Sequence, residues 1–405
     1  MKIFYDKILA LLLAVALVLP LASCRSKEAE EALKGGISIG EDAPYSDETL
    51  AYAEQIIQTL VVYTYRKMVL DKIPESVEDR LAGYAHRICA ITAKIPVSEA
   101  QYRRAIDLLA QDGQGVIDEL AAFRAGELKA CQKTRKLYLE LTSIFGADHV
   151  ASMLYDGCLF IYDARYERLM EKFETYQYPW YQEDAEAMLA QKEVFEKSVG
   201  EESFSALVRC SIAMAELLSS EAKEISGAFS DSEILEVLRH LELSAIQIDE
   251  DGWNLLLSWV ITQNDASYQA DFCKLLKDTG DVERIAAIMN NALELLVTVT
   301  QQLMPEDIAM LREEKREELL SSVFSRFDDR DWELFKAVTT ISLSNEAYHA
   351  LASEEYGVAY SEYLACIRQV TLDELRASVG EADFYQNLSD YLAAICPAMS
   401  YEVKQ

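Results

Sequence analysis

Hydrophobic residues recur at every third or fourth position along most of the chain from Asp47 onward, without the strict alternation that is typical of β-strands. The clearest example is formed by Val282, Ile285, Met289, Ala292, Leu296 and Val299. Because an α-helix completes a turn in about 3.6 residues, this spacing places the six side chains along one face. We therefore expect a helix here whose apolar face packs inside the protein.

Helix start and stop signals are frequent in the same region. Capping boxes, in which Ser or Thr precedes Gln or Glu by three residues, begin at Ser98, Ser230 and Thr371. Prolines suited to a first helical turn are Pro74 and Pro305. Glycines placed as C-terminal caps after apolar runs are Gly146, Gly200, Gly280 and Gly380. The sequence predicts an all-α array of helix hairpins, either α-solenoid-like or a stacked helical bundle.

The N-terminal segment has the order of a secretory signal. A short, mildly basic lead from Met1 to Lys7 precedes an apolar stretch from Ile8 to Leu19. The following Leu21-Ala22-Ser23-Cys24 resembles the lipobox of bacterial lipoproteins. That resemblance implies cleavage before Cys24, a diacylglyceryl group on its thiol, and a membrane-anchored protein facing outside the cytoplasm. The apolar stretch is shorter than the roughly 20 residues of a membrane-spanning helix, which makes a stable transmembrane span the weaker interpretation.

Four segments follow from these patterns. Residues 1–23 are the predicted signal peptide, and residues 24–45, rich in Glu and Gly, are a predicted flexible tether. Helical domains are expected over 46–228 and 229–405, with the boundary placed at a Ser- and Gly-rich break near 226–232. One continuous array is the alternative.

Composition narrows the classes of function. A formal net charge of −31 repels nucleic acid, so nucleic acid is excluded as a partner. Hydrophobic residues make up 51% of the chain, enough for a large core. Beyond Cys24, seven cysteines remain, and their apolar neighbours indicate buried thiols, with one or two disulfides as the alternative. They are Cys89, Cys131, Cys158, Cys210, Cys273, Cys366 and Cys396.

The sequence offers no catalytic residue, metal site or cofactor that we would assign. Glu346 with His349, and Glu236 with His240, are spaced for one helix face, but neither completes a recognised metal motif. The segment from Gln247 to Gly252 is similar to the start of an EF-hand calcium loop, yet it lacks the first aspartate and the twelfth-position glutamate. We expect instead a turn capped by Asp251.

Aromatic residues crowd into one short segment between Tyr155 and Tyr181. Its last part, around Pro179, holds the predicted binding patch Tyr176, Tyr178, Trp180 and Tyr181. Such residues suit binding of a protein, a peptide or a glycan, whereas a buried aromatic turn is the structural alternative. Two functions are carried forward: a membrane-tethered, non-enzymatic helical binding scaffold, and an all-helical envelope hydrolase with a carboxylate-based site.

Overall fold

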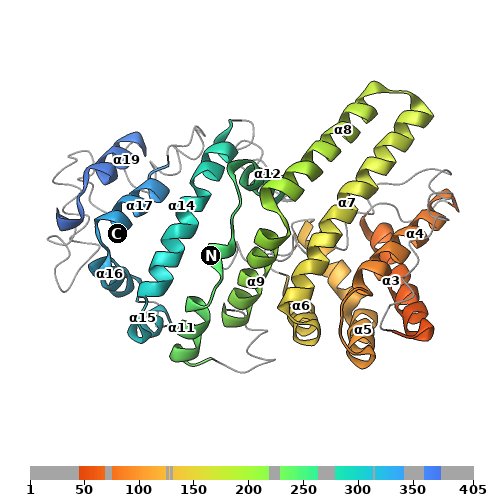
Figure 1. Ribbon diagram of the computed structural model, residues 1–405, viewed down its shortest axis with the longest axis horizontal. Coiled ribbons are helices and arrows are strands. Elements are labelled where there is room, and N and C mark those ends of the chain that lie inside the picture. The colour runs from red at the N-terminus through yellow and green to blue at the C-terminus, as the bar shows by residue number, and fades with distance from the viewer. Residues whose placement is uncertain are drawn as a thin grey trace. The chain divides into compact units, whose positions relative to one another are not determined.

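A computed structural model describes residues 45–68, 75–124, 127, 131–218, 229–262, 279–312, 315–341 and 360–374. Every regular element in these ranges is a helix (Figure 1), which confirms the all-α prediction. The predicted signal peptide, Cys24 and all of the predicted tether except Tyr45 lie outside the described residues.

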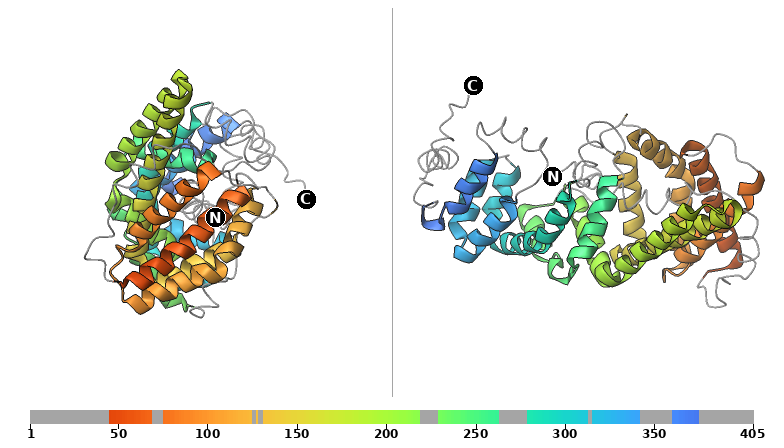
Figure 2. Two further views of the ribbon diagram at one scale, coloured as in Figure 1. Left: turned by 90° about the vertical axis from the view of Figure 1, so that its right-hand side faces the viewer. Right: turned by 90° about the horizontal axis from the view of Figure 1, so that it is seen from above.

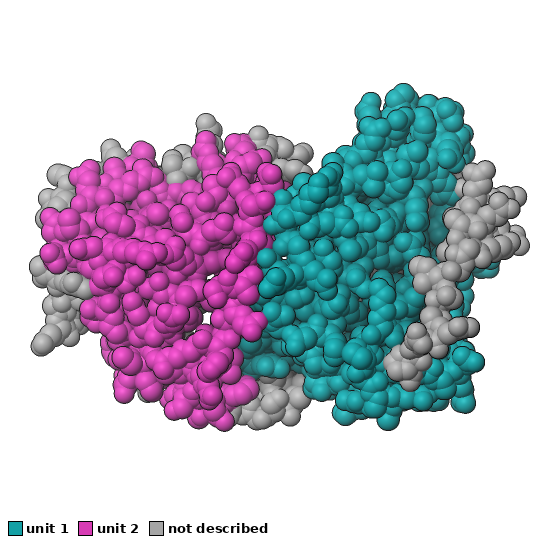
Figure 3. Space-filling model, viewed as in Figure 1, with its two compact units in different colours: residues 1–227, 263–267 teal, residues 228–262, 268–405 magenta. Residues whose placement is uncertain are grey.

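The chain divides into two compact units, shown in Figure 3. Unit 1 comprises residues 1–227 and 263–267, and unit 2 comprises 228–262 and 268–405. The described helices of unit 1 are α3 (Asp47–Met68), α4 (Glu75–Thr92), α5 (Glu99–Arg124), α6 (Gln132–Phe145), α7 (Ala147–Tyr176), α8 (Pro179–Val194), the π-helical turn η2 (Phe195–Val199) and α9 (Glu201–Leu218). Those of unit 2 are α11 (Asp231–Arg239), the 3₁₀ turn η3 (Leu243–Ala245), α12 (Glu250–Thr262), α14 (Asp281–Gln302), α15 (Pro305–Arg312), α16 (Arg316–Arg326), α17 (Asp329–Thr339) and α19 (Tyr360–Gln369).

The helix boundaries follow the local signals. All three capping boxes form, with reciprocal hydrogen bonds between Ser98 and Gln101, Ser230 and Glu233, and Thr371 and Glu374. Gly146, Gly200 and Gly280 have φ values of 85°, 71° and 72°, a region that glycine enters without steric cost. Pro305 begins α15. Pro74 and Gly380 lie outside the described residues.

Helices α3 and α5 run parallel and in register. Tyr52 donates to Asp107 at 2.9 Å and Tyr63 donates to Asp118 at 2.8 Å, so both bonds join residues 55 positions apart. At the start of α3, Ser46 and Thr49 donate to the Glu99 carboxylate of α5, which lowers the pKa of Glu99. Tyr45 is buried and stacks on Tyr102 at 4.2 Å, so the folded part begins no later than Tyr45, the last residue of the predicted tether.

Helix α4 is joined to α7 by two ion pairs, whose basic residues lie seven positions apart on α4. Arg80 pairs with Glu171 at 3.1 Å and Arg87 with Glu167 at 3.0 Å. Lys94, just beyond α4, pairs with Asp156. Residue numbers rise by 14 from Arg80 to Lys94 while they fall by 15 from Glu171 to Asp156, so α4 and α7 run in opposite directions. Helix α7 therefore has a fixed lateral position against α4.

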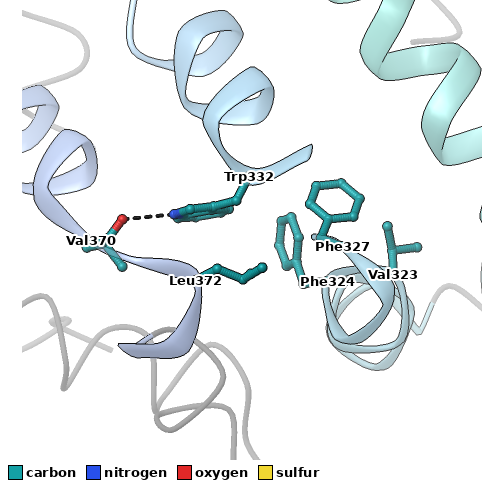
Figure 4. Packing of buried hydrophobic residues seen from close by; sticks show 6 residues of the cluster. All are labelled: Val323, Phe324, Phe327, Trp332, Val370 and Leu372. Carbon is teal, nitrogen blue, oxygen red and sulfur yellow. Dashed lines mark hydrogen bonds between the residues drawn. The ribbon is translucent and has the colours of Figure 1, made fainter. Parts of the chain in front are cut away.

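Unit 2 is built around an aromatic cluster, drawn in Figure 4. Its buried members are Val323, Phe324, Phe327, Trp332, Val370 and Leu372. The indole N–H of Trp332 donates to the Val370 carbonyl at 2.8 Å, which joins α17 to the end of α19. Nearby, the fully buried Asp307 accepts bonds from the Met304 amide and the Ser322 hydroxyl, and it pairs with Arg326.

The predicted apolar stripe of α14 is only partly internal. Val282 is buried and Val299 packs against the aromatic cluster, but Leu296 is 44% exposed. At that end of the helix the cluster is contacted by Leu295, Val299 and Leu303, spaced by four residues. This row places Leu295 rather than Leu296 toward the cluster, and the expectation of a fully buried face was wrong at Leu296.

Candidate functional site

Helices α7 and α8 form a long hairpin whose closed end projects beyond the other described helices of unit 1 (Figures 1 and 2). Gln177 ends α7 in the left-handed conformation, with φ 56° and ψ 26°, and its amide donates to the Phe173 carbonyl at 2.7 Å. Pro179 then begins α8, where its missing N–H costs nothing. The turn between the helices therefore consists of Gln177 and Tyr178 alone.

All four residues of the predicted patch meet at this closed end; together Tyr176, Tyr178, Trp180 and Tyr181 are called the aromatic tip. The rings of Tyr178 and Trp180 stack with centroids 4.4 Å apart and planes within 14°. Tyr176 lies nearly parallel to Tyr178 at 6.2 Å. Tyr181 is within 6.3 Å of the other three rings. The tip is one continuous aromatic assembly.

The aromatic tip faces solvent. Tyr176, Tyr178 and Trp180 are 46%, 47% and 51% exposed, so the alternative of a buried aromatic turn is wrong for these three residues. The earlier aromatics of the same segment behave differently, because Tyr155, Phe160 and Tyr162 are buried. Core packing thus explains the aromatic residues in the first part of the segment. It does not explain the three exposed rings of the aromatic tip.

Charged groups beside the tip are almost all acidic. Residues 173–191 contain four carboxylates and no Lys or Arg. These exposed carboxylates, called the acidic collar, are Glu174, Glu183, Asp184 and Glu186. The nearest cation in sequence, Lys172, lies 5.2 Å above the Tyr181 ring, a contact that the sequence pattern did not predict. Burial, and next the positive charge of Arg168, lower the pKa of Lys172, while Asp184 acts in the opposite direction.

The base of the hairpin is held by packing and by charge. Phe195, at the end of α8, is fully buried and lies 5.1 Å from the Tyr155 ring and 5.4 Å from the Phe204 ring. The π-helical turn at this point is closed by a 2.9 Å bond from the Gly200 amide to the Phe195 carbonyl. Lys192 of α8 pairs with Asp163 of α7 at 2.7 Å. These contacts fix the two helices on which the aromatic tip is mounted.

Within the described residues, the carboxylates with a raised pKa are Glu171 and Glu216, and raised pKa values are one sign of a catalytic acid. Burial raises the pKa of Glu171 to about 7 against the opposing charges of Arg80 and Arg168, and burial raises the pKa of Glu216. Neither carboxylate contributes to the shift of the other. Glu171 forms an ion pair with Arg80, so a structural role in joining α7 to α4 explains its position.

Four cysteines have side chains in the described part of the chain, and two of them, Cys89 and Cys158, have strongly raised pKa values. Cys89, Cys131, Cys158 and Cys210 are buried and take no part in a disulfide, as predicted. Burial raises the pKa of Cys89 to about 11 and that of Cys158 to about 12, which keeps both as thiols at neutral pH. The side chains of Cys273, Cys366 and Cys396 lie outside the described part.

The remaining metal candidates are accounted for by helix ends where the structure describes them. Asp249 caps α12 by accepting from the Gly252 amide at 2.9 Å, so the cap is Asp249 and the expectation of Asp251 was wrong. His240 is bonded through Nδ1 to the Glu236 carbonyl at 2.7 Å. Within the described residues no group of three His, Cys, Asp or Glu side chains is arranged to hold a metal ion. Glu346 and His349 lie outside that part.

A shallow groove of about 340 Å³ lies on the α3–α5 face of unit 1. Its lining residues are Gln55, Gln58, Thr59, Val62, Tyr63, Arg66 and Gln114. None of them is a carboxylate, so this groove lacks the acid and base pair that a carboxylate-based hydrolase needs.

No family model, no curated protein and no solved structure matches this chain. None of the helices in the described ranges has the long, nearly uncharged apolar run that a bilayer crossing needs.

Proposed function

We propose that the protein is an exported lipoprotein, held at the membrane by a diacylglyceryl group on Cys24, that binds a partner in the cell envelope through its aromatic tip. The lipobox-like Leu21 to Cys24 supports the anchor. The half-exposed rings of Tyr176, Tyr178 and Trp180 are the observation that carries the binding role.

Two properties of the aromatic tip favour a binding role: its apolar surface is exposed to water, and its rings are held rigidly. Leaving three large aromatic side chains half exposed forgoes about 25 cal/mol for every Å² of apolar surface kept in water, and a contiguous patch of this kind is typical of an interaction surface. Tyr and Trp lose little rotamer freedom on binding and dominate binding hot spots. A two-residue turn on a packed hairpin presents these rings in one arrangement, so little ordering entropy is spent on association.

The hydrolase hypothesis stays a prediction without an observation that favours it. Its strongest element, Glu171, is paired with Arg80. The binding role therefore stands as the single proposed function.

Changing Tyr178→Ala together with Trp180→Ala is expected to lower recovery of the partner by ~30-fold or more, because two central aromatic hot spots are removed. The mature, lipidated chain is immobilised in detergent, incubated with envelope extract, and the bound proteins and glycans are quantified by mass spectrometry.

Leu189→Ala with Leu296→Ala provides the matched control, since Leu189 and Leu296 are exposed to 43% and 44% and lie outside the tip. The control pair is expected to retain the full recovery. Equal recovery by the wild-type chain and the tip variant would remove the aromatic tip as the binding surface.

A further inference from the structure

The aromatic tip and the acidic collar occupy the same end of one hairpin. Glu174 precedes the tip on α7, and Glu183 and Asp184 follow it in the first two turns of α8. All three side chains are exposed. A ligand lying on the rings therefore meets negative charge on both sides of the turn.

The molecule already places a cation on one of these rings. Lys172 lies above Tyr181 at 5.2 Å, within the roughly 6 Å range of cation–π attraction. Tyr176, Tyr178 and Trp180 have no such cation among the contacts of the described side chains, although they are the more exposed members of the tip. Electron-rich faces of Trp and Tyr rings attract guanidinium and ammonium groups, and adjacent carboxylates add ordinary charge attraction.

On this basis, and resting on the proposed function, we infer that the partner presents a basic polypeptide segment whose Arg or Lys side chains lie on Tyr176, Tyr178 and Trp180 while the acidic collar balances their charge. A bilayer surface does not fit, because anionic headgroups repel the collar carboxylates. A neutral glycan uses the rings but gains nothing from the net charge of the collar. A positively charged peptide segment therefore fits the aromatic tip and the acidic collar better than a bilayer surface or a neutral glycan does.

The inference is tested with a defined probe, the peptide Arg-Gly-Arg-Gly-Arg, titrated calorimetrically into the mature chain in detergent. The same peptide with citrulline in place of arginine keeps the shape and removes the charge. We expect the arginine peptide to bind roughly tenfold more tightly than the citrulline peptide, as a few cation–π and ion contacts provide.

Two variants separate the rings from the collar. Tyr178→Ala with Trp180→Ala is expected to weaken the arginine peptide by roughly tenfold, since two ring contacts are lost. The collar variant changes three of the four collar carboxylates, Glu174→Gln, Glu183→Gln and Asp184→Asn. It is expected to weaken binding of the arginine peptide by roughly fivefold, with a smaller effect at high salt. The matched control, Asp112→Asn with Glu196→Gln and Glu202→Gln, makes the same charge change at exposed positions of unit 1 away from the tip and is expected to have less than about a twofold effect.

Each result that contradicts the inference points to a different cause. An equal loss in the collar variant and the control would show that the net charge of the protein, and not the tip, attracts the peptide, and this would overturn the inference. Binding of a short N-acetylglucosamine oligomer through the tip, in place of the peptide, would identify a glycan partner and also overturn it. If the tip variant loses the envelope partner but the collar variant keeps it, the proposed function stands and the basic partner is wrong. If both variants keep it, both proposals fail.

Discussion

Replacing Phe195 by Ala is expected to lower the free energy of unfolding of unit 1 by about 3–5 kcal/mol, the usual cost of emptying a well-packed phenylalanine site. Phe195 is fully buried, and its ring contacts Tyr155, Tyr162 and Phe204 on the two neighbouring helices. The cost arises because the rings around Phe195 are held by their own helices and relax only partly into the space that the phenyl ring leaves. The loss falls at the base of the hairpin that carries the aromatic tip.

Hydrogen exchange followed by mass spectrometry measures this effect segment by segment, which suits a chain with two units. Faster exchange is expected in α8 and in the part of α7 around Tyr155. Leu189→Ala on α8, the helix that precedes Phe195, is the control, expected to change stability by less than about 0.5 kcal/mol because Leu189 is exposed. Unchanged exchange in Phe195→Ala would show that the hairpin base is held by other contacts.

Replacing Trp332 by Ala is expected to destabilise unit 2 by about 3–5 kcal/mol. The indole lies 5.3 Å from the Phe335 ring and 5.9 Å from the Phe324 ring. Figure 4 shows Trp332 between Val370 and the rings of Phe324 and Phe327. Its N–H also satisfies the Val370 carbonyl, which tethers the end of α19. The variant therefore loses apolar packing and leaves a carbonyl without its partner.

Trp332→Phe separates the two contributions. The phenyl ring retains most of the packing but cannot donate to Val370, so a smaller loss of about 1–3 kcal/mol is expected from the unmade hydrogen bond. Faster amide exchange in α17 and in residues 367–372 is the measurement. Equal losses in Trp332→Ala and Trp332→Phe would mean that the hydrogen bond, and not the packing, dominates this site.

Local signals in the sequence predicted the helical architecture well. Each capping box is formed by residues three positions apart, and a glycine with positive φ needs only its own backbone, so neither depends on distant parts of the chain. The aromatic tip was predicted for the same reason. Pro179 fixes a turn, and residues on either side of a two-residue turn are close in space wherever the hairpin lies.

Contacts between distant helices could not be read from the sequence. Arg80 of α4 meets Glu171 of α7, a contact that depends on how these two helices pack. The exposure of the tip is of the same kind. Tyr155 is buried and Tyr176 is exposed, although both belong to the same aromatic segment of the sequence. Only the projection of the hairpin distinguishes them.

The protein can reach a partner in the cell envelope only after export, so the state of its N-terminus is decisive. Intact-mass and fragment-ion mass spectrometry of the chain purified from membranes measures that state. We expect an N-terminus at Cys24 with a diacylglyceryl group on its sulfur and no peptide from residues 1–23. A chain that retains Met1 to Ser23, or an unmodified Cys24 thiol, would contradict it.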